Sequence, residues 1–94
     1  MRVTTAELRR ACEMLLRHLE ATGQHEIEIA EDYYWAIAPG EAYAAYSTPS
    51  QFTMGQLSDD WQEVMAIVNG DKEAVGYALV WLSSVMRRVG ETVP

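Results

Sequence analysis

The sequence predicts a small α+β fold, with an antiparallel β-hairpin or small sheet packed against about three α-helices. Apolar residues recur at helical spacing near both ends of the chain and in residues 57–68. They instead alternate with polar residues over 26–37, which is typical of a strand. Because 94 residues leave room for one core, we expect a single domain spanning residues 1–94.

The first helix is predicted to start after Thr4, because Thr4 and Glu7 have the spacing of a capping box. Gly23 is a suitable left-handed end for it. The helix carries one apolar stripe, made of Leu8, Ala11, Cys12, Leu15, Leu16 and Leu19. This stripe places Cys12 in the core and argues against a nucleophilic role for its thiol.

A strand is expected from the alternation of residues 26–29, and Tyr33, Trp35 and Ile37 continue the same odd-numbered face. Glu31 interrupts this face. Either the strand bulges near residues 30–32 or two short segments meet there, so the register stays open.

The stretch after this strand is harder to interpret. Pro39-Gly40 suits a type II turn. Within 41–56, the segment around Tyr43 and Tyr46 fits either a helical turn or an irregular strand. Residues 50–54 suit a second strand, paired antiparallel with residues 27–37.

Two caps compete for the start of the second helix: Thr53 with Gln56, or Ser58 followed by Asp59 and Asp60. The helix is expected to end at Asn69-Gly70. Its apolar stripe consists of Leu57, Trp61, Val64, Met65 and Val68, which makes Trp61 a core residue.

The last helix is expected to be capped by Asp71, to be stopped by Gly90 and to be apolar on two sides. One side carries Val75, Ala78, Leu79, Leu82, Met86 and Val89. The opposite side carries Tyr77, Val80, Trp81 and Ser84. Such a helix needs cover on both sides. We expect a homodimer through the second face; the alternative is that the hairpin and the Tyr43–Phe52 loop cover it.

Charge is unevenly distributed along the chain, whose formal net charge is -7. No Lys or Arg lies between Arg17 and Lys72, whereas ten acids lie there. An acidic chain without a basic stripe is not expected to bind nucleic acid. The acidic segment is either a solvated face or a surface for a basic protein partner.

The sequence contains few residues in patterns typical of catalytic or metal-binding sites, and we expect no catalytic residues and no cofactor. Asp32, Asp59 and Glu63 are weak candidates for oxygen ligands of a divalent metal, since Mg²⁺ and Mn²⁺ prefer carboxylates. The aromatic residues Tyr33, Tyr34 and Trp35 are candidates for an interaction surface. His18 and His25 have neither zinc-site nor nucleophile spacing.

Three segments resemble a family of small uncharacterised bacterial proteins: DYYW at residues 32–35, GQLSDDW at 55–61 and LVWLSSVMRRVGE at 79–91. The resemblance covers nearly the whole chain. It implies a bacterial, cytoplasmic, single-domain protein, and it transfers no activity and no site residues.

These observations favour a non-enzymatic, acidic protein-interaction domain of a bacterium, with a regulatory or inhibitory role. The alternative is a small carboxylate-dependent metalloenzyme or ligand-binding protein. No apolar run approaches the roughly 20 residues of a membrane span, and the N-terminus lacks the apolar core of a signal peptide. The single cysteine provides no disulfide framework, so we expect a cytoplasmic protein.

Overall fold

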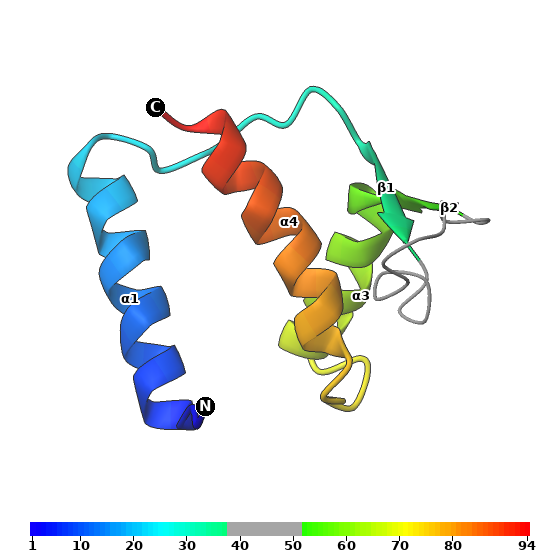
Figure 1. Cartoon of the computed structure of the whole chain (residues 1–94), viewed down its shortest axis with the longest axis horizontal. Coiled ribbons are helices and arrows are strands. Elements are labelled where there is room, and N and C mark those ends of the chain that lie inside the picture. Colours follow the sequence, from blue (N-terminus) through cyan, green and yellow to red (C-terminus); the bar gives the residue numbers. More distant parts are fainter. Residues whose placement is uncertain (38–51) are drawn as a thin grey trace.

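The computed structural model describes the backbone of residues 1–37 and 52–94, and the side chains outside 35–53. Its elements confirm an α+β fold with a two-stranded antiparallel sheet (Figure 1). They are, in chain order, α1 Thr5–Ala21, β1 Tyr33–Ile37, β2 Phe52–Gln56, α3 Leu57–Val68 and α4 Ala78–Thr92. The turn expected at Pro39-Gly40 and the segment around Tyr43 and Tyr46 lie outside the described residues.

Helix α1 starts and ends as its local sequence predicts. The Thr4 hydroxyl accepts a hydrogen bond from the Glu7 amide at 3.0 Å, and Glu7 Oε1 accepts one from the Thr4 amide at 3.1 Å. These two bonds complete the capping box. At the other end, Gly23 has a φ of 86°, and the Gln24 amide donates to the Leu19 carbonyl.

The β-hairpin pairs β1 with β2 from Tyr33↔Gln56 to Ile37↔Phe52. The antiparallel pairing expected from sequence is therefore confirmed. The second strand lies at Phe52–Gln56, about two residues later than expected.

The expected strand at residues 26–29 is wrong. β2 ends at Gln56, opposite Tyr33, and α3 begins at Leu57, so β2 does not continue alongside the residues before Tyr33. Without a partner strand, an extended segment does not form a ladder. The alternation still orients the side chains: Ile27 and Ile29 are half-buried, whereas Glu26 and Glu28 are exposed.

Helix α3 begins at Leu57, so neither cap expected from its own sequence starts it. Thr53 belongs to β2, and Gln56, the residue before the helix, makes no capping bond with its side chain. The expected end is confirmed, because Gly70 has a φ of 81° and follows directly after Asn69.

Helix α4 begins at Ala78 rather than after Asp71, so both the Asp71 cap and the placement of Val75 in the helix are wrong. Gly76 explains the delay, since glycine disfavours helix by about 1 kcal/mol relative to alanine. Gly90 does not stop the helix either: its φ is not positive, and the helix continues to Thr92. Pro94 disfavours helical dihedrals at Val93, which is extended.

The core is small. Among the described elements, the close pairs are α3 with α4, β1 with β2, and β2 with α3. Leu57, at 4% exposure, is the one buried apolar side chain of the described residues, and neither α1 nor α4 contains a buried residue. Trp61 was expected in the core but is 44% exposed.

No helix in the described ranges is long and apolar enough to cross a membrane.

Candidate interaction surface

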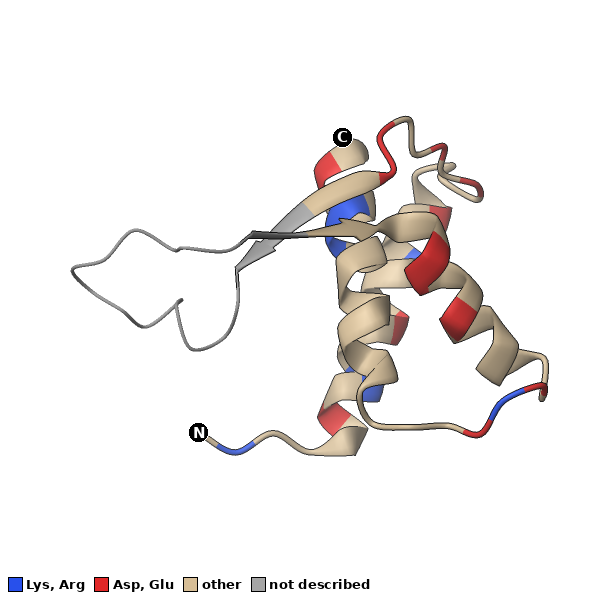
Figure 2. Ribbon diagram, turned by 90° about the vertical axis from the view of Figure 1, so that its right-hand side faces the viewer, with Lys and Arg blue, Asp and Glu red and all other residues tan. Residues whose placement is uncertain are grey.

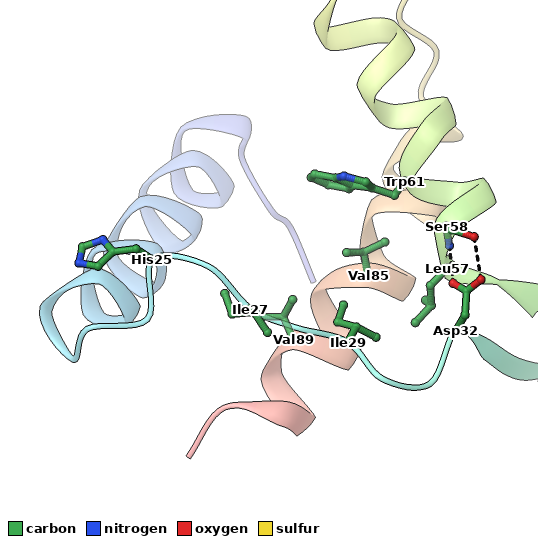
Figure 3. Close-up of a pocket in the computed structure, with 9 residues that line it drawn as sticks. All are labelled: His25, Ile27, Ile29, Asp32, Leu57, Ser58, Trp61, Val85 and Val89. Atoms are coloured by element: carbon green, nitrogen blue, oxygen red, sulfur yellow. Dashed lines mark hydrogen bonds between the residues drawn. The ribbon is translucent and has the colours of Figure 1, made fainter.

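Asp32 caps helix α3 from a distant part of the chain. Its carboxylate accepts hydrogen bonds from the Ser58 amide at 2.6 Å and from the Ser58 hydroxyl at 2.7 Å (Figure 3). The Gln56 side-chain amide donates to the same carboxylate at 2.8 Å, and the Leu57 amide donates to the Asp32 carbonyl at 2.7 Å. Asp32 thus satisfies two of the amides that a helix N-terminus leaves without intrahelical partners, those of Leu57 and Ser58. These bonds hold Asp32 against the start of α3.

The pKa of Asp32 lies below its ordinary value of 3.8, chiefly because the Ser58 hydroxyl donates to the carboxylate. Desolvation opposes this effect, and the bonds from Gln56 and the Ser58 amide add to it. A carboxyl group whose pKa is lowered by folding stabilises the fold above its unfolded pKa, and this contribution is lost as pH falls through the folded pKa.

We therefore expect Asp32→Asn to be less stable than wild type at pH 7, with the difference shrinking below about pH 4. Urea denaturation of both proteins at pH 7 and pH 3 measures this change. The pKa of Glu7 is also lowered, by the hydrogen bonds from Thr4, so Glu7→Gln serves as a separate control for acid sensitivity at α1. A stability difference that is the same at both pH values would contradict the role of the Asp32 charge.

Asp60 joins three elements through one carboxylate oxygen. Its Oδ2 accepts a hydrogen bond from the Tyr34 hydroxyl on β1 at 2.5 Å and one from the Ser84 hydroxyl on α4 at 2.7 Å. Burial raises the pKa of Tyr34, and the bond to Asp60 raises it further. The DYYW and GQLSDDW segments therefore meet, as the expected hairpin implies, and Ser84 connects them to α4.

A groove lies on the side of this framework that faces α1. Its first part, about 670 Å³, has the apolar residues of α3 and α4 on one side and the segment before β1 on the other (Figure 3). Ile27 and Ile29 point toward Val85 and Val89 of α4, and the Trp61 ring lies above them. Asp32 and Ser58 lie at one end, and His25 lies at the opposite end.

The second part of the groove, about 490 Å³, separates α1 from α4. It shares Ile27, Trp61, Val85 and Val89 with the first part, so the two are continuous. One wall is the apolar stripe of α1, namely Cys12, Leu15, Leu16 and Leu19. The other wall is formed by Leu82, Val85, Met86 and Val89 of α4. The faces that the sequence assigns to one core thus line an open apolar groove.

The second apolar face expected on α4 is divided in the structure. Tyr77 and Val80 are 64% and 51% exposed, as an interaction face requires. Trp81 is half-buried: the Tyr77 ring packs edge-on to it at 5.7 Å, and Lys72 Nζ lies 5.0 Å from its ring centroid. Ser84 turns toward Asp60. Trp81 and Ser84 therefore make contacts within the chain.

The three aromatic residues proposed at β1 also differ from one another. Tyr33 is 54% exposed, whereas Tyr34 is half-buried against Gly55 and Asp60. The backbone of Trp35 pairs with Met54, and its side chain lies outside the described part. Of this set, Tyr33 is the residue whose described side chain is available to a partner.

The three weak candidates for metal ligands, Asp32, Asp59 and Glu63, lie in different surroundings in the structure. Asp32 binds Ser58 and Gln56, and Glu63 forms an ion pair with Lys72. Asp59 is exposed in the first turn of α3. In residues 1–37 and 52–94, no three His, Cys, Asp or Glu side chains are grouped in a way that could hold a metal ion. The three candidate ligands are therefore not brought together as one group in the described residues.

The connection between α1 and β1 and helix α3 carry acidic residues without Lys or Arg (Figure 2). Helices α1 and α4 carry both signs: α1 has three Arg and three Glu, and α4 has two Arg and one Glu. Two ion pairs are local, Arg17 with Glu13 and Arg87 with Glu91, while Arg88 contacts Glu31 at 3.2 Å. Within the described ranges Arg9, Arg10, Glu26 and Glu28 form no ion pair.

Sequence reasoning missed the walls of the groove as functional residues, because an apolar helical stripe normally indicates core. The available signal was quantitative: α1 and α4 both have wide apolar faces, and a chain of 94 residues has few segments that can cover them.

Comparisons with protein-family models, with curated proteins and with solved structures give no significant match for this chain.

Proposed function

We propose that this chain is a non-catalytic protein-interaction domain, whose groove binds an apolar-faced, basic segment of another polypeptide. The observation that carries the proposal is the exposure of the apolar faces of α1 and α4. Both are amphipathic helices without a buried residue, and their apolar faces line one continuous groove. Contiguous exposed apolar surface of this kind marks interaction sites in soluble proteins.

Charge defines the class of partner. The groove is bordered by the connection between α1 and β1, and the sequence has no Lys or Arg from Glu20 to Asp71. Glu26 and Glu28 alternate with the groove residues Ile27 and Ile29, so their exposed carboxylates lie beside the apolar surface. Complementary charge speeds encounter and selects partners, while apolar contact supplies most of the affinity. A basic, amphipathic segment meets both requirements.

The test is affinity capture from a lysate of cells that contain the untagged natural chain, at low and moderate salt, with bound proteins identified by mass. Leu15→Glu places a charge in the groove. Met14→Glu adds the same charge on the neighbouring residue, which is 57% exposed and outside the stripe, and serves as the control.

We expect wild type and Met14→Glu to capture the same basic protein. Leu15→Glu should fail to capture it, and salt should release it because screening weakens exposed charge pairs. Equal capture by Leu15→Glu would contradict the groove as the binding surface. Capture of nothing by the wild type would contradict the function.

A further inference from the structure

We propose that α1 is a hinged lid, which closes on α4 in the free chain and has to open before a partner can fill the groove. The structure shows the open arrangement, in which α1 lies across the groove from α4 (Figure 1). This inference rests on the proposed function, because it describes how access to the same groove is regulated.

The two walls of the groove match in character. One apolar stripe of α1 faces one apolar face of α4 across a space of about 490 Å³. Leu15 and Leu16 are 65% and 48% exposed, and neither helix contains a buried residue. When α1 moves onto α4, both faces leave water together, which favours the closed arrangement. The opposite side of α1, with Arg10, Glu13 and Arg17, stays in water.

The attachment of α1 to the rest of the fold allows this movement. Among the described elements, α1 belongs to none of the closely packed pairs. The hydrogen bond that ends it, from the Gln24 amide to the Leu19 carbonyl, is internal to the helix and its cap. The chain is next fixed at Asp32, which is bound to the start of α3. Within the described ranges, no backbone hydrogen bond involves residues 25–31.

The hinge lies at His25 and Glu26, between the end of α1 and the part of the connection that contacts α4. Both residues are exposed. After them, Ile27 points toward α4, and Glu31 forms an ion pair with Arg88 of α4. A hinge needs only a few residues that absorb the change in dihedral angles. Rotation at this point moves α1 as a rigid body and breaks no backbone hydrogen bond of the described chain.

Closure regulates binding because α1 and a partner compete for the same wall of α4. Since α1 is joined to that wall by a short connection, it acts at a high effective concentration. The apparent affinity for a partner falls in proportion to the open fraction. The first part of the groove has no residue of α1 in its lining, so a partner can engage there while the second part is closed.

The first experiment measures closure through Cys12, the single cysteine of the chain, which lies in the α1 wall of the groove. Its rate of alkylation by iodoacetamide is compared in wild type, Leu15→Glu and Met14→Glu. Leu15→Glu opens the lid, because the closed contact would bury a charge. We expect Leu15→Glu to react about 10-fold faster than wild type, as a closed fraction of about 90% implies.

Met14→Glu is the control for this rate, because residue 14 lies outside the stripe and should react no faster than wild type. Both substitutions add a negative charge near the thiol, which by itself disfavours the reactive thiolate. A faster reaction of Leu15→Glu therefore measures opening, provided that far-ultraviolet circular dichroism shows the helices retained. A wild-type rate equal to that of Leu15→Glu would overturn the inference. Protection of Cys12 that increases with protein concentration would also overturn it, since a second copy would then cover α1.

The second experiment locks the lid with a disulfide and places no charge in the groove. Leu82→Cys and Met86→Cys each add a thiol on the α4 wall that faces Cys12. A disulfide requires two Cα atoms within about 7 Å of each other, which helices in contact can provide. We expect at least one of these variants to form a disulfide within a single chain under mild oxidation. Arg87→Cys is the control and should not, because residue 87 is exposed and outside the groove.

The locked variant also distinguishes this inference from the proposed function. In the lysate capture, its oxidised form should retain about one tenth or less of the partner that its reduced form retains. Equal capture by the two forms would overturn the regulatory role. Failure of both wall variants to form the disulfide, or an equal yield in Arg87→Cys, would overturn closure itself. A wild type that captures nothing contradicts the proposed function instead, and the Cys12 rates and the disulfide still measure closure without any partner.

Discussion

Leu57→Ala is expected to lower the free energy of unfolding by about 2–4 kcal/mol. Leu57 is 4% exposed and is the single buried apolar side chain of the described residues. It begins α3 directly after β2, and its amide donates to the Asp32 carbonyl. Truncation removes apolar contact and leaves a cavity at the junction of the hairpin, α3 and the groove. Urea denaturation monitored by circular dichroism measures the loss.

Leu79→Ala is the matched control for this prediction. The same chemical change is made in α4, where Leu79 is 66% exposed, and alanine and leucine both favour helix. We expect a loss of at most about 0.5 kcal/mol, as is usual for surface substitutions. Both variants are compared with wild type at one protein concentration, because self-association raises apparent stability. Equal losses at the two positions would contradict the assignment of Leu57 as the core and would show that Leu79 is covered in solution.

The parts of the fold that could be predicted from sequence are those set by neighbouring residues. The capping box of Thr4 and Glu7 and the left-handed end at Gly23 depend on contacts within a few residues. The start of α3 does not: its cap is Asp32, which lies 26 residues before Ser58. The sequence around Thr53 and Ser58 could not reveal a cap supplied from elsewhere in the chain.

Neighbouring elements of the same chain also determine the structure of the segments that were assigned wrongly from sequence. Residues 26–29 have the alternation of a strand, and their isoleucines do face inward, but β2 ends at Gln56, opposite Tyr33, and does not reach far enough to pair with them. Likewise, the sequence predicts the apolar stripe of α1. How much of that stripe is exposed depends on how closely α4 approaches it, which the sequence does not indicate. Periodicity identifies which side chains need cover, and the arrangement of elements determines whether the same chain provides it.

Gly55→Ala is expected to lower the free energy of unfolding by about 1–3 kcal/mol through overpacking. Gly55 pairs with Tyr34 in the hairpin, and the Tyr34 ring lies directly over it. A methyl group at position 55 would lie 2.5 Å from both Cε1 and the hydroxyl oxygen of Tyr34, well inside normal contact distance. The ring must therefore move, which breaks the hydrogen bond from Tyr34 to Asp60.

A double-mutant cycle separates this steric effect from the general properties of glycine. Gly55 does not have a positive φ, so alanine is compatible with its backbone and reduces the entropy of the unfolded chain. In a Tyr34→Ala background, Gly55→Ala should therefore be neutral or stabilising by up to about 1 kcal/mol. Additive effects in the cycle would contradict the close contact. Coupling of about 1–3 kcal/mol would show that the small residue at 55 leaves room for the Tyr34 ring, whose hydroxyl donates to Asp60 of α3.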